Sequence, residues 1–290
     1  MSGGPEAPRG ARSLAKRLPG VPALLASPAW KRFIHWRIVR FAPRRNDPFT
    51  RFLRLPTQFE ALVGPVLDFL ALPAGAPLRM ICAGCSNGAE TVTIAATLAH
   101  HRPGLAFHID AFDIDPAVLA VASAAEYTEQ QVRGGNPFMT DAFVSRVFDV
   151  DGDRYRVKPE ILGHLTYGPG SLLDADYIAH LGRADVVFAQ NFLFHLPRRL
   201  NAAALRSLCA MLEPRAALFI EGMDEDLRVK LTRRAGLRPL AYRIERIHAE
   251  GRERRGAFWP WHYTGLEPWD PARRNRDRWY GTIYLREADV

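Results

Sequence analysis

The sequence has no apolar run long enough to cross a membrane. Its 290 residues are 48% hydrophobic and 24% charged, a composition typical of a globular protein with a sizeable core. A membrane-spanning helix needs about 20 consecutive apolar residues, and one of the longest candidates, Leu212–Ile220, is interrupted by Glu213 and Arg215. The sequence therefore predicts a soluble protein without a transmembrane segment.

Cysteines are also scarce, since the chain has only Cys82, Cys85 and Cys209. Three cysteines in a chain of this length do not make a disulfide framework, which favours the reducing cytoplasm as its location. Cys82 and Cys85 form a C-x-x-C pair, but a zinc site needs a second ligand pair and a redox site needs a thioredoxin-like context. Neither is present, so we expect two thiols lining a turn and no metal.

Acidic residues are almost missing from the first 54 residues, where twelve lysines and arginines face only Glu6 and Asp47, a net charge of +10. The remaining 27 basic and 29 acidic residues leave the rest of the chain at −2. A basic arm on a near-neutral body attracts an anionic partner, or else remains a solvated tail. Because the excess is confined to the arm and no base-reading motif is present, we do not expect a nucleic-acid substrate.

The composition divides the chain into three regions. Residues 1–27, rich in Gly, Pro, Ala and Arg, predict a disordered basic arm. Residues 28–76 predict a helical, basic segment, and residues 77–290 a single α/β domain. Within that domain we expect a small insert at 126–163 and an insert rich in aromatic and basic residues at 249–278.

Short apolar segments alternate with helical ones from residue 78 onward. Strands are expected at Leu78–Ala83, Leu105–Phe112, His164–Tyr167, Ala184–Ala189 and Ala216–Glu221. Helices are expected at Ala89–His101, Pro116–Ala125, Ala175–Leu181, Arg198–Leu212 and Asp224–Ala235. Successive strand–helix units predict a parallel, doubly wound sheet. Two antiparallel strands, Pro239–His248 and Trp279–Arg286, are expected to close the domain.

Two features at the ends of the first strands indicate a nucleoside ligand. The turn Ala83–Gly88 (AGCSNG) has small residues such as Gly84 that let the backbone approach a ligand closely, and a helix N-terminus follows it. Asp113 ends the next strand, where a carboxylate can accept hydrogen bonds from both ribose hydroxyls. Asp115 is an alternative ribose ligand or the cap of the helix that starts at Pro116. The turn lacks the G-x-G-x-x-G spacing of dinucleotide-binding proteins.

Five blocks of sequence resemble the chemotaxis-receptor (CheR-type) methyltransferases, in the family's order over residues 48–221. The turn and the residues after it, A-G-C-S-N-G-A-E, are similar to the family's A-G-C-S-x-G-x-E, and its D-I-D follows at 113–115. The other blocks are T-R-F-L-R at 50–54, Y-R-V-K-P-E at 155–160 with S-L-L-D at 171–174, and D-V-V-F-A-Q-N-F-L-F-H-L at 185–196.

The resemblance implies a Rossmann-like class I methyltransferase fold with a mostly parallel seven-stranded sheet. It also implies methyl transfer from S-adenosylmethionine to a protein glutamate. Carried over by position, Thr50, Arg54 and Glu90 would contact the methionine end of the cofactor or the reacting region, and Gly84 belongs to the glycine-rich motif. Asp113 would bind the ribose, Ser171 and Leu172 would flank the adenine, and Asn191 and Phe192 would lie beside the methionyl part and the methyl group.

The chemistry suits a carboxylate acceptor, because a glutamate with an ordinary pKa of about 4.3 is ionised at neutral pH and needs no general base. Arg54 could orient that carboxylate by a bidentate contact. The chain departs from the family at Pro48, at Gln190, where the family has Arg, and at His195, where it has Tyr. His195 is either a base for a hydroxyl, thiol or amine acceptor or a packed histidine.

These departures leave two other functions open. One is a small-molecule O- or N-methyltransferase with the same core, and the other is a non-catalytic module that binds S-adenosylmethionine as a regulatory ligand. The 249–278 insert bears on the acceptor, because long loops rich in aromatic residues and arginine are typical of lids and interfaces. We predict that it covers the acceptor site or docks a partner, the alternative being a packed loop. Its aromatic residues are Phe258, Trp259, Trp261, His262, Tyr263 and Trp269.

Overall fold

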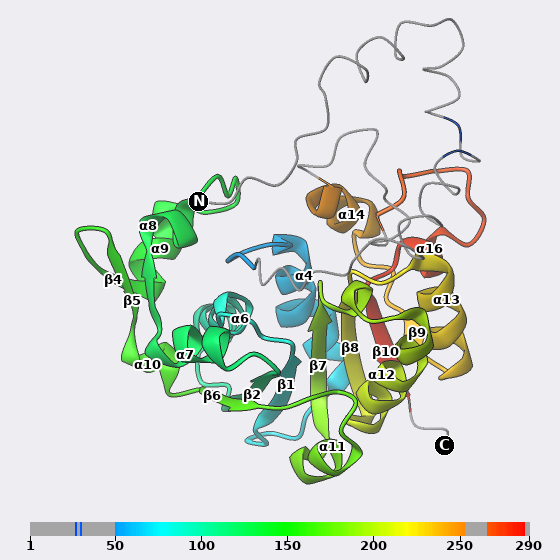
Figure 1. Ribbon diagram of the computed structural model, residues 1–290, viewed down its shortest axis with the longest axis horizontal. Helices are drawn as coiled ribbons and strands as arrows, with labels where there is room; N and C mark the ends of the chain where they lie inside the picture. Colours follow the sequence, from blue (N-terminus) through cyan, green and yellow to red (C-terminus); the bar gives the residue numbers. More distant parts are fainter. Residues whose placement is uncertain (1–26, 28–29, 31–49, 253–265, 288–290) are drawn as a thin grey trace, which may run out of the picture.

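The computed structural model describes Ser27, Trp30 and residues 50–252 and 266–287 (Figure 1). The basic arm predicted at 1–27 and the first part of the helical segment predicted at 28–76 lie largely outside the described residues. So do residues 253–265 of the predicted insert. Among the described helices, none combines the length and hydropathy that crossing a bilayer requires.

A seven-stranded sheet in the order β6-β2-β1-β7-β8-β10-β9 forms the centre of the described chain. The strands are β1 (Leu78–Ala83), β2 (Phe107–Asp113), β6 (Leu165–Pro169), β7 (Ala184–Gln190), β8 (Leu212–Glu221), β9 (Arg238–Pro239) and β10 (Ile283–Arg286). β10 runs antiparallel to both of its neighbours, and the other pairs are parallel. The predicted Rossmann-like, mostly parallel sheet is confirmed.

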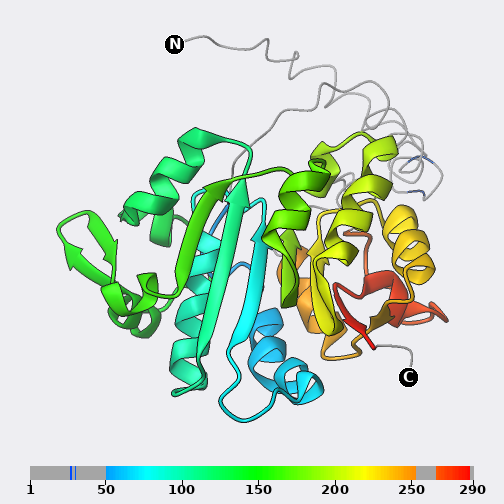
Figure 2. The same cartoon turned by 90° about the horizontal axis from the view of Figure 1, so that it is seen from below.

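Helices cover both faces of this sheet (Figure 2). They are α6 (Ala89–His101), α7 (Pro116–Ala124), α11 (Ala175–Leu181), the short η2 (Leu193–His195), α12 (Arg198–Ala210), α13 (Glu225–Arg234), α14 (Ile244–Arg252) and α16 (Arg276–Tyr280). Alternate residues of β1 enter two separate cores, Met80 with α6 and Ile81 with α12. Because successive side chains of a strand point to opposite faces, both faces of β1 are buried, as in doubly wound sheets.

Two additions flank the main sheet. The first is a broken helix before β1, made of α4 (Pro56–Ala61), the π-helical turn η1 (Leu62–Val66) and α5 (Leu67–Leu70). The second fills the region predicted as a small insert and holds an antiparallel sheet in the order β3-β5-β4. Its elements are β3 (Glu126–Thr128), α8 (Glu129–Arg133), α9 (Asp141–Val147), β4 (Phe148–Asp151), β5 (Arg154–Val157) and α10 (Pro159–Leu162).

The strand predicted at Pro239–His248 is wrong. Only Arg238 and Pro239 pair with β10, and Arg243 then adopts a φ of +42°, which ends the extended segment. The following residues form α14, whose residues Ile244, Ile247 and His248 lie at helical spacing and are buried. The spacing of these side chains fits a helix rather than a strand. The last predicted strand is also shorter, because Trp279 belongs to α16 and β10 starts at Ile283.

Helix α14 is anchored to the start of α4 by a buried carboxylate. The N-cap of α4, Leu55, has no side chain that can accept from the helix. Glu250, only 7% exposed, supplies this acceptor from 193 residues away. Its oxygens accept the backbone N–H of Thr57 at 3.1 Å and the Thr57 hydroxyl at 2.6 Å. This contact fixes α4 against the C-terminal part of the chain.

The described second half of the 249–278 insert is packed. The backbone N–H of Glu267 donates to Glu225 at 2.8 Å, and its carboxylate accepts from the Trp279 indole at 2.7 Å. The Trp269 ring packs against those of His248 and Tyr280. The other five aromatic residues named for the insert lie outside the described residues, so its role as a lid stays a prediction.

Candidate cofactor and active site

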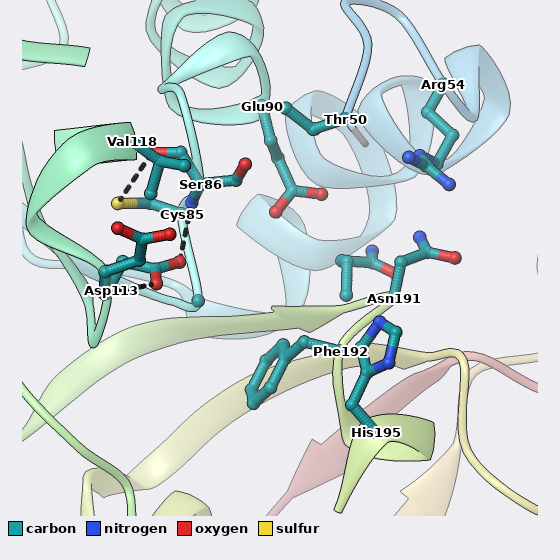
Figure 3. A pocket seen from close by; sticks show the side chains of 13 residues that line it. Thr50, Arg54, Cys85, Ser86, Glu90, Asp113, Val118, Asn191, Phe192 and His195 are labelled. Atoms are coloured by element: carbon teal, nitrogen blue, oxygen red, sulfur yellow. Dashed lines mark hydrogen bonds between the residues drawn. The ribbon is translucent and has the colours of Figure 1, made fainter. Parts of the chain in front are cut away.

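The residues predicted as a site meet at the carboxyl ends of β1, β2 and β7. This is where the strand order of the sheet reverses, with β2 on one side of β1 and β7 on the other. Ligands of open α/β sheets bind at such a point. A pocket there is lined by Thr50, Arg54, Gly84, Cys85, Ser86, Glu90, Asp113, Asp115, Val118, Gln190, Asn191, Phe192 and His195 (Figure 3).

The turn after β1 lets the chain pass close beneath the pocket. Gly84 adopts a φ of +67°, a region that favours glycine. A Cβ on Gly84 would lie 2.6–3.0 Å from three ring atoms of Phe192. Glycine is therefore required both by the backbone conformation and by the aromatic ring that packs on it. Gly88, with a φ of +85°, then starts α6.

Asp113 is held at the rim by backbone donors. One carboxylate oxygen accepts the N–H of Ser86 at 2.9 Å, and the other accepts the N–H of Asp115 at 3.1 Å. A carboxylate oxygen has more than one acceptor site, so Asp113 keeps capacity for a ligand hydroxyl. Asp115 caps α7, because its side chain accepts the N–H of Ala117 at 2.9 Å. The cap is the second of the two roles considered for Asp115.

Two opposite charges face each other at the other end of the pocket. The Glu90 carboxylate, from the first turn of α6, and the Arg54 guanidinium both point into it (Figure 3). Burial raises the pKa of Glu90 to about 7, Arg54 and the Cys82 thiol oppose this rise, and Glu221 adds to it. The Cys82 sulfur donates to Glu90 at 3.4 Å. A cation placed beside Glu90 would favour its ionised form.

The end of β7 is tied to its neighbours by side chains. Asn191 has a φ of +60°, its N–H donates to the Glu221 carbonyl at 3.0 Å, and its side-chain amide donates to the Glu221 carboxylate at 3.0 Å. Gln190 donates to Gln58 at 2.5 Å, and Gln58 in turn donates to Thr282 at 2.8 Å. The wall of the pocket is thereby joined to α4 and to the residue before β10.

A second, more apolar cavity adjoins the first. Its lining is Gly84, Phe112, Asp113, Ile114, Gly170, Ser171, Leu172, Leu173, Phe192, His195 and Leu196. Ser171 and Leu172 are thus placed together on its wall, separate from Arg54 and Glu90. Phe192 and His195 line both cavities, as do Gly84 and Asp113.

All of the predicted site residues line one of these two cavities. The sequence reasoning missed Gln58 and Glu221, which hold Gln190 and Asn191 in place. No local motif indicates them, because each acts across the fold on a residue far away in the sequence. The two thiols of the C-x-x-C pair are buried, and burial raises the pKa of both, so they are protonated and pack beneath the turn.

The polar, charged and apolar groups that line the two cavities fit S-adenosylmethionine. Asp113 offers a carboxylate to ribose hydroxyls, and the apolar cavity beside it offers Phe112 and Leu172 to an adenine ring. Glu90 offers a negative charge to the ammonium group of an amino acid, and Arg54 beside it offers a positive charge to a carboxylate. The order of these groups along the joined cavities matches the order of base, sugar and amino acid in the cofactor.

Comparisons with known proteins identify the family of this chain. The family model "CheR methyltransferase, SAM binding domain" matches residues 48–240. The probable biofilm formation methyltransferase WspC of Pseudomonas putida is 32% identical over 196 residues, 67% of this chain and 44% of that protein. A probable chemotaxis protein methyltransferase of Rhizobium etli is 32% identical over 178 residues, 59% of this chain and 65% of that protein.

Among solved structures, magnesium protoporphyrin IX methyltransferase from Synechocystis PCC 6803 with bound SAM is 16% identical with a TM-score of 0.38, covering 76% of this chain and 86% of that one. The match to WspC spans less than half of that relative's length. The family model, in contrast, covers well over half of this chain. The chain belongs to the CheR methyltransferase family, whose members carry an S-adenosylmethionine-binding domain.

Proposed function

We propose that this chain transfers the methyl group of S-adenosylmethionine to a carboxylate, the side chain of a protein glutamate. The observation that carries the proposal is the convergence of Arg54, Glu90, Asp113 and Asn191 on one pocket from positions spread over the sequence. Similarity to chemotaxis protein methyltransferases supports a protein acceptor.

The protein's own residues would divide the work between binding and alignment. Asp113 binds the ribose, Ser171 and Leu172 flank the adenine, and Glu90 pairs with the ammonium of the methionyl group. Thr50 and Asn191 contact the same end of the cofactor. S-adenosylmethionine supplies an electrophilic methyl group on a positively charged sulfur.

Arg54 would orient the acceptor carboxylate by a bidentate contact, so that one of its oxygens points at the methyl carbon. As the new C–O bond forms and the C–S bond breaks, the bonding electron pair stays on sulfur. No proton moves, because a glutamate is already ionised at neutral pH. The rate then depends on alignment and on the exclusion of water.

A second candidate follows from the place of His195. It lines both cavities, next to the expected methyl position, where the resembling family has Tyr. A histidine there could take a proton from a hydroxyl or amine during methyl transfer. The product separates the two functions, because a carboxyl methyl ester is hydrolysed by mild alkali and an ether or N-methyl group is not.

The test has a binding part and a transfer part. Calorimetry on the wild type should give micromolar affinity for S-adenosylmethionine. Transfer of radioactive methyl to a panel of glutamate-rich helical peptides should then yield product that releases methanol in alkali. Alkali-stable label would favour the second candidate. Binding with no transfer to any acceptor would favour a regulatory module, and a folded protein that binds no S-adenosylmethionine would overturn the proposal.

A further inference from the structure

The aromatic ring of Phe192 stands between the two cavities. Asp113 lies on one side of the pocket, Arg54 and Asn191 lie on the other, and Phe192 and His195 lie below the gap between them (Figure 3). Phe192 is also among the few residues that line both cavities. A group that joins a sugar bound by Asp113 to an amino acid bound by Glu90 would lie beside this ring.

The ring is held in place by Gly84. Because Gly84 has no Cβ, three ring atoms of Phe192 occupy space only 2.6–3.0 Å from where that Cβ would be. Phe192 also packs against the core on the α12 side of the sheet, so the ring is supported from that side as well. The ring is a built part of the pocket wall rather than a surface side chain.

In S-adenosylmethionine bound in this order, the joining group would be the sulfur. In S-adenosylmethionine the sulfur joins the ribose to the amino acid and carries a positive charge, and in the demethylated product it is a neutral thioether. Aromatic faces carry partial negative charge and attract cations within about 6 Å of the ring centre.

We propose that the aromatic ring of Phe192 attracts the positively charged sulfur of the ligand, and so raises the affinity for the sulfonium relative to that for the thioether. This inference rests on the proposed function, because it requires S-adenosylmethionine to occupy the two cavities in the order given above. The consequence is weaker retention of the product once the methyl group has left. The carboxylates of Glu90 and Asp113 also attract positive charge. Both stay in place when Phe192 alone is substituted, so the substitution isolates the contribution of the ring.

The test compares the affinities of S-adenosylmethionine and S-adenosylhomocysteine by calorimetry. Phe192→Leu keeps an apolar side chain of similar volume and removes the aromatic ring. It should weaken binding of the sulfonium by about 3- to 10-fold, the range of a partly desolvated cation–π contact, and leave that of the thioether unchanged. Phe192→Tyr should keep the wild-type ratio.

Phe112→Leu is the matched control. Phe112 lines only the apolar cavity and packs edge-on against Tyr177, away from the sulfur position. Its replacement should weaken both ligands by the same factor. Replacing Phe192 with mono-, di- and trifluorinated phenylalanine should lower the preference for the sulfonium stepwise, since fluorine withdraws charge from the ring face without changing its shape greatly.

The outcomes separate this inference from the proposed function. Loss of the affinity ratio in Phe192→Leu, with thermal unfolding near that of the wild type, is the expected result. An unchanged ratio in a variant that still binds S-adenosylmethionine would overturn the role of Phe192 and leave the proposed function intact. If Phe192→Leu does not fold, the fluorinated series decides, and a flat response there also overturns the inference. Failure of the wild type to bind either ligand would instead overturn the proposed function.

Discussion

The two ends of the pocket are built in different ways. At the end that we propose binds the nucleoside (the nucleoside end), Asp113 accepts from backbone N–H groups of residues 27 and 2 positions away. At the end that we propose for methyl transfer (the reaction end), the side chains of Gln190 and Gln58 are hydrogen-bonded across 132 positions of the sequence, and Gln58 donates to Thr282 across 224. The nucleoside end is therefore local and made from backbone, whereas the reaction end is assembled from distant side chains.

This difference has a functional meaning. Backbone donors cannot be changed by substitution, so the nucleoside end suits a ligand that stays the same. Side-chain contacts can be exchanged one at a time, so the reaction end suits an acceptor that differs between relatives. Two of the three departures of this chain from the resembling family, Gln190 and His195, line the pocket that also holds Arg54 and Asn191, which agrees with this view. The third, Pro48, lies outside the described residues.

The largest expected effect is at the nucleoside end. Asp113→Ala should weaken S-adenosylmethionine binding by about 100-fold or more, because it removes the ribose acceptor and frees the two backbone N–H groups that shape the turn. Calorimetry measures this loss. Asp110→Asn, on the same strand but outside the pocket, is the control and should bind as the wild type does. Wild-type affinity in a folded Asp113→Ala protein would contradict the placement of the ribose.

At the reaction end, Arg54→Lys should separate transfer from binding. Lysine keeps the charge but cannot make a bidentate contact with a carboxylate. We expect kcat/KM for the acceptor to fall by about 100-fold and S-adenosylmethionine affinity by less than about 10-fold. Arg243→Lys, which pairs with Glu60 outside the pocket, is the matched control. Equal losses in affinity and in transfer would place Arg54 on the cofactor alone.

Burial raises the pKa of Glu90 to about 7, and this value predicts a pH dependence of S-adenosylmethionine binding. The ionised carboxylate would bind the methionyl ammonium, so S-adenosylmethionine affinity should rise as the pH increases toward 7 and level off above it. Calorimetry in buffers of different ionisation enthalpy should show a proton released on binding near pH 6. Glu90→Gln should remove both effects, and a wild-type affinity that is flat from pH 5.5 to 8 would contradict them.

In the unliganded protein, the raised pKa of Glu90 makes the fold less stable as the pH rises. Because the folded pKa of Glu90 lies above its ordinary value of 4.5, folding takes up a proton between these two values. The free energy of unfolding should therefore fall as the pH rises from 4.5 through 7, by up to about 3 kcal/mol. Urea unfolding of the wild type and of Glu90→Gln at pH 5 and pH 8 measures the difference.

The sequence predicts the nucleoside end of the pocket better than the reaction end. The turn at Gly84, the acid at Asp113 and the alternation of strands and helices are local patterns, and the structure places them as expected. The strand predicted at Pro239–His248 is wrong because Ile244, Ile247 and His248 lie at helical spacing and form the buried face of α14. Gln58 and Glu221 could not have been found, since their importance depends on contacts that exist only in the folded chain.

The smallest effect concerns the side-chain bridge that builds the reaction end. Gln58→Leu leaves the amide of Gln190 and the hydroxyl of Thr282 without their buried partner, so unfolding free energy should fall by about 1–3 kcal/mol. The loosened Gln190 should lower methyl transfer by about 3- to 10-fold while S-adenosylmethionine affinity stays within about 2-fold.

Thr282→Val is the control, because it breaks only the outer bond of the bridge and leaves Gln58 paired with Gln190. It should lose stability without a matching loss of transfer, as measured by urea unfolding and single-turnover methylation at saturating cofactor. If both variants lose transfer in proportion to stability, the bridge supports the fold in general. If Gln58→Leu alone loses transfer, the reaction end is positioned by long-range side-chain contacts, and the contrast between the two ends of the pocket stands.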